Sequence, residues 1–163
     1  MIKASKLDDS LVGELKRLQK IVNEIQELCI KHKPNIAIIE GLAFMARNTT
    51  ALMQLATLNY LIRFMLSGMS IRFYVVVPTQ LKKFITGKGN APKDIMMLET
   101  YKHYKMSFYD DNVCDAFGLS QIGSGLLAGK VKLNSYQQEV INSLKQQIYE
   151  ERKIKSKRCI RSN

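Results

Sequence analysis

Three acidic residues in this chain have the side-chain types and positions that could bind a divalent metal ion. Glu40 follows the apolar run Ile36–Ile39, and active sites of α/β proteins usually lie where strands end at the carboxyl edge of the sheet. Asp111 and Asp115 are one helical turn apart, so both side chains would lie on one face of a helix. Carboxylate oxygens suit hard cations such as Mg²⁺, and two-metal nucleases surround the scissile phosphate with Asp and Glu. The pattern therefore makes these three residues candidate Mg²⁺ ligands.

A simpler interpretation of the same residues is purely structural. Asp110 and Asp111 are favoured residue types at a helix N-terminus, where a carboxylate caps free N–H groups and interacts well with the helix dipole. Glu40 would then be a solvated strand end. Spacing alone favours this interpretation, so the metal site needs further support.

The loop Thr86–Lys93 is a candidate phosphate-binding segment. The loop would offer free backbone N–H groups and two lysines, Lys88 and Lys93, close to an expected helix N-terminus, which together would form a phosphate cradle. The loop is not a P-loop, because the required glycine and lysine spacing is absent and no strand leads into it. An ordinary turn is the alternative. His32 and His103 have no nearby Ser or Cys nucleophile, so we predict that both lie at the surface.

Helices and two short strands must position these residues. Apolar periodicity predicts helices over residues 10–33, 49–66, 78–84, 92–105 and 111–128, and a charged helix from residue 135 onward. Continuous apolar runs predict buried parallel strands over residues 35–40 and 71–77. The chain is therefore expected to be an α/β protein.

The predicted sheet is small. Before Asn35 the only further strand candidate is the short segment Met1–Lys6, so the sheet would have two or three strands. A sheet of that size leaves Ile36, Ile38 and Ile39 on an uncovered edge, which favours aggregation.

Composition restricts the class of protein. Of 163 residues, 46% are hydrophobic and 24% charged, as in one soluble globular domain. No apolar stretch could span a bilayer and the N-terminus has no secretion signal, so a cytoplasmic location is expected. Three cysteines without a C-x-x-C pair indicate neither disulfides nor a thiolate zinc site. The net charge of +11, which stays positive after the basic tail is set aside, favours nucleic acid as partner over an anionic membrane surface.

Three motifs in order resemble the RuvC family of Holliday-junction resolvases over about residues 1–128. Glu40, followed by Phe44–Asn48, resembles the family's second catalytic glutamate and its Phe-Met-Ala-Lys-Asn segment, with one extra residue between them. Pro78–Lys93 is similar to the family's long Gln-Val-Lys and Gly-x-Gly-x-Ala-x-Lys signature. Asp111–Ala116 resembles the Asp-x-x-Asp-Ala segment that supplies the last two metal ligands.

The resemblance implies an RNase H-like α/β fold with a mixed sheet flanked by helices. It also implies a homodimer that makes symmetric nicks in four-way DNA junctions during recombination and repair. The cofactor would be Mg²⁺, for which Mn²⁺ could substitute, with no other small-molecule cofactor and no membrane partner. Carried across by motif, the metal ligands would be Glu40, Asp111 and Asp115, and Lys93 would complete the catalytic set.

DNA contacts also follow from the resemblance. Lys82 and Lys93 would contact the scissile backbone and Phe44 would stack near the junction centre, because lysines neutralise phosphate charge and an aromatic ring holds an unstacked base. Arg47, Lys83 and Lys88 would add contacts to the DNA. The RuvC-like domain would cover residues 1–133, and residues 134–163 would form a charged helix and basic tail.

Two features depart from the family pattern. Asn112 stands three residues before Asp115, so the penultimate ligand is assigned to Asp111, four before, which stays on the same helical face. The family begins with a strand that carries the first catalytic aspartate, and Asp8 and Asp9 lie instead at a helix cap, so the expected domain lacks its first strands. The leading hypothesis is a compact, phage-like junction endonuclease of the host cytoplasm. Two alternatives stay open: a catalytically incomplete junction-binding fragment or remnant, and an RNase H-like protein that binds RNA.

Overall fold

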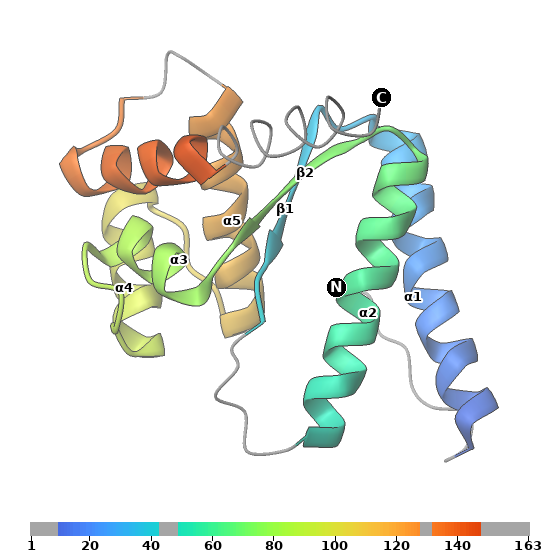
Figure 1. Cartoon of the computed structure of the whole chain (residues 1–163). Helices are drawn as coiled ribbons and strands as arrows, with labels where there is room; N and C mark the ends of the chain where they lie inside the picture. Colours follow the sequence, from blue (N-terminus) through green and yellow to red (C-terminus); the bar gives the residue numbers. More distant parts are fainter. Residues whose placement is uncertain (1–9, 43–48, 128–131, 148–163) are drawn as a thin grey trace, which may run out of the picture. The chain divides into compact units, whose positions relative to one another are not determined.

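The computed structural model of this chain describes residues 10–42, 49–127 and 132–147 (Figure 1). The chain divides into two compact units, Met1–Val75 and Val76–Asn163, and each is described by itself. The predicted division at residues 133 and 134 stays a prediction. None of the described helices is long and apolar enough to cross a membrane.

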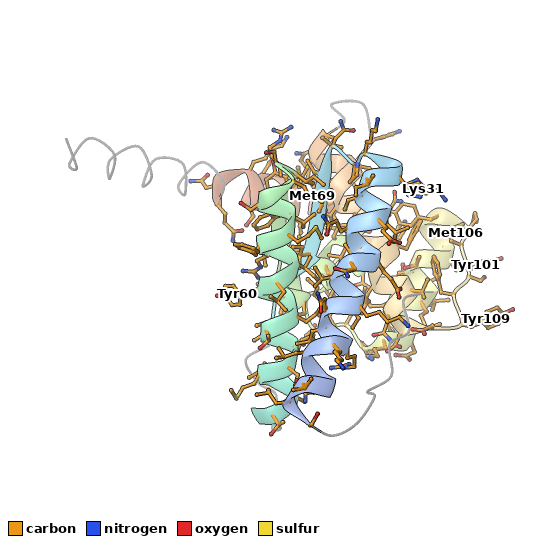
Figure 2. The ribbon with its side chains drawn as sticks, turned by 90° about the vertical axis from the view of Figure 1, so that its right-hand side faces the viewer. Lys31, Tyr60, Met69, Tyr101, Met106 and Tyr109 are labelled. Carbon is orange, nitrogen blue, oxygen red and sulfur yellow. The ribbon has the colours of Figure 1, made fainter. Side chains whose placement is uncertain are left out.

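The first unit contains two helices and a two-stranded parallel ladder. Its elements are α1 (Leu11–His32), β1 (Ile36–Glu40), α2 (Thr49–Gly68) and β2 (Arg72–Val76), whose last residue begins the second unit. Helices α1 and α2 pack against each other, and Figures 1 and 2 both place them on the same side of the strands. The predicted α/β class and the order helix, strand, helix, strand are confirmed.

Local signals determine where α1 begins and ends. The Ser10 side chain accepts a hydrogen bond of 3.0 Å from the N–H of Gly13, as an N-cap residue does. At the other end Lys33 adopts the left-handed conformation and its N–H donates to the carbonyl of Cys29, directly before Pro34. The sequence predicts a helix start at Asp9 or Ser10 and a stop before Pro34; the structure has Ser10 as the N-cap and confirms the stop.

The strands are less buried than their apolar sequences predict. Ile36, Ala37, Ile38 and Ile39 are half-buried, and only Val76 of β2 is fully buried. Among the described residues β1 has β2 as its only ladder neighbour, and the two helices cover one side. The prediction of a fully buried β1 is therefore wrong for this part of the chain, whereas the predicted small sheet is confirmed. Met1–Lys6, the third strand candidate, lies outside the described residues.

The second unit is helical. It contains α3 (Pro78–Thr86), α4 (Lys93–Tyr104), α5 (Asp111–Leu127) and a further helix over residues 135–147, as the apolar periodicity predicts. Helices α3, α4 and α5 contact one another. Their core is formed by fully buried side chains from α3, α5 and the last helix: Leu81, Phe84, Ile85, Ile122, Ile141 and Leu144. Lys93 and Asp111, two of the candidate site residues, lie at the N-termini of α4 and α5.

Candidate functional site

Asp110 forms the cap of α5. Its Oδ1 accepts hydrogen bonds from the N–H of Asn112 at 2.8 Å and from the Asn112 side-chain amide at 3.0 Å. Its carbonyl accepts the N–H of Cys114, which starts the helix. The structural interpretation is therefore correct for Asp110. The next residue, Asp111, bonds instead to a lysine of α4.

Lys93, at the N-terminus of α4, donates a hydrogen bond to Oδ2 of Asp111 and forms an ion pair with it. The hydrogen bond from Lys93 is the main reason that the pKa of Asp111 lies below its ordinary value, and the same bond raises the pKa of Lys93. The Lys93 side chain is 72% exposed, and an exposed ion pair contributes little to stability. The pair therefore joins two candidate site residues without being an important source of fold stability.

Asp115, one turn further along α5, has the opposite electrostatic environment. Burial is the main cause that raises its pKa, and the negative charge of Asp111 raises it further. The positive charges of Lys93 and Lys82 act in the other direction. The ionised form of Asp115 is thus disfavoured, although the positive charges of two lysines offset part of this effect.

This carboxylate pair fits a divalent cation. Its ligand atoms are hard oxygens, it already attracts the ammonium of Lys93, and the unfavourable charge on Asp115 would be relieved by a second positive centre. Neither unit, over its described residues, contains a cluster of three or more His, Cys, Asp or Glu that could hold a metal ion. The second unit thus provides a pair of candidate ligands.

Glu40, the third candidate ligand, is exposed at the last position of β1 in the first unit. Its predicted place at a strand's carboxyl end is confirmed. Its main-chain carbonyl accepts a hydrogen bond of 3.1 Å from the side-chain amide of Asn59 in α2. Sequence reasoning missed Asn59, although an asparagine within an apolar helix was a usable signal. The grouping of Glu40 with Asp111 and Asp115 remains a prediction.

The candidate DNA-binding lysines have different surroundings. Lys82 acts electrostatically on Asp115, and Lys88 is exposed in the loop after α3. Lys83 instead donates to Glu139 of the last helix at 2.6 Å, so a carboxylate already neutralises its charge. Phe44 and Arg47 lie outside the described residues.

The Thr86–Lys93 loop is an internally bonded turn. The N–H of Gly87 donates to the Lys83 carbonyl, and that of Lys88 donates to the Thr86 hydroxyl. The N–H of Ala91 donates to the Lys88 carbonyl. The expected cradle of free N–H groups is therefore wrong at these three positions, and the loop's attraction for phosphate rests on lysine side chains.

The two histidines are exposed, as predicted. Nε2 of His103 lies 3.2 Å from the Tyr136 hydroxyl, a contact that joins α4 to the last helix, and 3.6 Å from a carboxylate oxygen of Glu99 within α4 itself. His103 therefore has a structural role.

Comparison with known proteins identifies one family. A family model described as Crossover junction endodeoxyribonuclease RuvC matches residues 9–121. A curated protein of that name from Brachyspira hyodysenteriae is 35% identical over 104 residues, which cover 64% of this chain and 64% of the relative. One from Carboxydothermus hydrogenoformans is 25% identical over 114 residues, or 69% of this chain and 72% of the relative. The match thus spans less than two thirds of the Brachyspira protein's length.

Solved structures show the same fold. Thermus thermophilus RuvC has a TM-score of 0.59 at 18% identity, covering 72% of this chain and 69% of that one. The structure of T. thermophilus RuvC in complex with a Holliday junction substrate has a TM-score of 0.57 at 18% identity and covers 64% of each chain. The predicted RNase H-like fold is confirmed by these neighbours.

Proposed function

Because this chain belongs to the RuvC family of crossover junction endodeoxyribonucleases, we propose that it resolves four-way DNA junctions by metal-dependent phosphodiester hydrolysis. The observation that carries this proposal is the arrangement at the N-termini of α4 and α5. There Lys93 pairs with Asp111, and Asp115 lies one turn away with its ionised form disfavoured. Such a carboxylate pair beside a lysine is suited to a cation and a phosphate together.

The metal is expected to be Mg²⁺, with Mn²⁺ as a working substitute. Asp111 and Asp115 would hold it together with Glu40. When bound, it would stabilise the charge that develops on the scissile phosphate and make water a better nucleophile. Lys93 and Lys82 would neutralise charge on the same phosphate, because lysines near an acidic site attract a polyanion that the carboxylates alone would repel.

The substrate is expected to be branched DNA. The net charge of +11 supports a polyanionic partner, and Lys82, Lys83, Lys88 and Lys93 of the second unit belong to the predicted DNA-contact set. We further expect Phe44 to stack on a base near the junction centre and Arg47 to contact phosphate. Symmetric nicking needs two active sites related by a two-fold axis, so the active form is expected to be a homodimer.

The decisive experiment measures cleavage of a four-way junction with and without Mg²⁺, with linear duplex DNA as control. We expect paired symmetric nicks that EDTA abolishes. Glu40→Gln and Asp111→Asn should each lower cleavage at least ~100-fold, because loss of a group that stabilises transition-state charge has effects of that order. Asp110→Asn is the matched control, since asparagine caps a helix as well as aspartate does.

Three other outcomes of the cleavage experiment would contradict parts of the proposal. Unchanged cleavage by Glu40→Gln would remove that residue from the site. Cleavage of linear duplex at the same rate would contradict junction selectivity. Tight junction binding by the unsubstituted chain without any cleavage would support the alternative, a junction-binding protein without catalysis.

A further inference from the structure

Asn59 is a buried polar residue on an apolar helix. Its side chain is only 7% exposed, and its neighbours along α2 include Leu55, Leu58 and Ile62. Its Nδ2 donates a hydrogen bond of 3.1 Å to the main-chain carbonyl of Glu40. Its Oδ1 is buried and has no hydrogen-bond partner among the residues that the structure describes. Half of this buried amide is therefore satisfied and half is not.

Fold stability does not explain an asparagine at this position. A buried carbonyl oxygen without a partner loses its bonds to water and gains none from the protein. A leucine has nearly the same shape as asparagine and matches the apolar residues that flank Asn59 along α2. One hydrogen bond typically contributes less net stability than one buried unsatisfied group costs, so the bond to the Glu40 carbonyl does not offset the unpaired oxygen. The donor half of the amide must therefore provide the benefit.

The donor half connects two elements at one peptide group. The bond runs from α2 to the last residue of β1, between residues 19 positions apart in the chain. The carbonyl of Glu40 belongs to the peptide that follows its Cα, so holding it restricts the ψ angle of Glu40. The ψ angle and the strand together determine the direction in which the Glu40 side chain leaves the backbone.

We propose that Asn59 is a positioning residue for Glu40, which it keeps oriented for cation binding by holding the end of β1. The inference rests on the proposed function, in which Glu40 is a metal ligand. Residues that orient a metal ligand from behind typically change metal affinity by 10- to 100-fold when they are lost. Asn59 itself would not coordinate the cation.

The test is the variant Asn59→Leu, which removes the donor and the unpaired oxygen together. Binding of Mn²⁺ to the full chain without DNA is followed through the electron paramagnetic resonance signal of free Mn²⁺. We expect Mn²⁺ affinity to fall about 10-fold while the urea midpoint of unfolding stays the same or rises. Thr57→Val is the matched control, because the Thr57 hydroxyl bonds to the Met53 carbonyl within the same helix. It should leave Mn²⁺ affinity unchanged.

Unchanged Mn²⁺ affinity in Asn59→Leu would overturn the proposal, and so would an equal loss in Thr57→Val. A second measurement does not depend on folding of a variant. In the unsubstituted chain, the side-chain amide signal of Asn59 should shift during Mg²⁺ titration with the same midpoint as the backbone amide of Glu40. A signal that stays still at saturating Mg²⁺ would also overturn it.

Failure of the proposed function would give a different pattern of Mn²⁺ affinities. If Glu40→Gln keeps full Mn²⁺ affinity, Glu40 is not a ligand and the metal site itself is wrong. If Glu40→Gln loses affinity and Asn59→Leu does not, only the positioning role fails.

Discussion

At the scale of single residues, Asp111 and Asp115 show how one helical turn can hold two carboxylates of opposite behaviour. The pKa of Asp111 is lowered, mainly by the hydrogen bond from Lys93, so its ionised form favours the fold. This contribution is present above the ordinary aspartate pKa and is lost as the pH falls through the lowered value. The pKa of Asp115 is raised, mainly by burial, so its ionised form opposes the fold once the pH exceeds its ordinary value. Acidification relieves that cost.

The cost at Asp115 predicts a conflict between stability and activity. Asp115→Asn removes the disfavoured charge, so we expect a higher free energy of unfolding at pH 7 and no gain at a pH below the ordinary aspartate pKa. Junction cleavage should fall at least ~100-fold, as for other losses of transition-state charge stabilisation. Urea unfolding at both pH values and a cleavage assay measure the two effects.

Added Mg²⁺ provides the control for Asp115→Asn. A cation that binds only the folded chain should raise the urea midpoint of the unsubstituted protein and have a smaller effect on the variant. An equal loss of stability at both pH values would show that Asp115 is held by favourable contacts and that its charge is not disfavoured.

At the scale of elements, the turn between α3 and α4 determines where Lys93 lies. Gly87 has a φ of 79°, a left-handed conformation that ends α3, and its N–H donates to the Lys83 carbonyl. A Cβ atom on Gly89 would lie 3.1 Å from the carbonyl oxygen of Thr79, so the loop returns close to the start of α3. The glycines of this loop therefore affect the position of Lys93 through the backbone conformation of the turn.

A methyl group at Gly87 is expected to weaken the second unit. Gly87→Ala places an L-residue at a positive φ, which costs about 1–2 kcal/mol. Gly68→Ala is the control, since no atom lies within 4 Å of its added Cβ, and its effect should stay within about 0.5 kcal/mol. Urea unfolding of both variants tests the difference. Equal stability of Gly87→Ala and the unsubstituted chain would contradict the requirement for a left-handed residue there.

At the scale of the whole molecule, the net charge of +11 governs the approach to DNA. Each lysine that neutralises a phosphate releases condensed counterions, so binding weakens as salt rises. Lys83 and Lys88 differ in the free protein, because Lys83 is paired with Glu139 and Lys88 is exposed, without an ion pair among the described residues. The two lysines should therefore contribute unequally to the salt dependence.

This difference can be measured with two alanine variants. Lys88→Ala should reduce the slope of log affinity for a junction against log salt by about 0.9, the value for one phosphate contact. Lys83→Ala should reduce it less, since Glu139 already neutralises that charge before DNA binds. Fluorescence anisotropy over a salt series gives both slopes. Equal slopes for the two variants would mean that the Lys83 and Glu139 pair opens at no cost on binding.

Helix ends were readable from the sequence because they depend on neighbours in the chain. Ser10 and Asp110 cap helices through bonds to residues two or three positions on, and Pro34 follows the end of α1. Such short-range signals do not need the rest of the fold. The choice of Asp111 over Asn112 as candidate ligand also came from local spacing, because Asp111 and Asp115 lie one turn apart on one helical face.

What only the tertiary structure decided involves residues far apart in the chain. The bond from Asn59 to Glu40 spans 19 positions, the pair of Lys93 and Asp111 spans 18, and the pair of Lys83 and Glu139 spans 56. The burial of β1 likewise depends on which elements cover it, whereas its apolar sequence reports only that it could be buried. Periodicity and capping act within one turn or strand, so they determine the elements, and packing between elements decides which side chains meet.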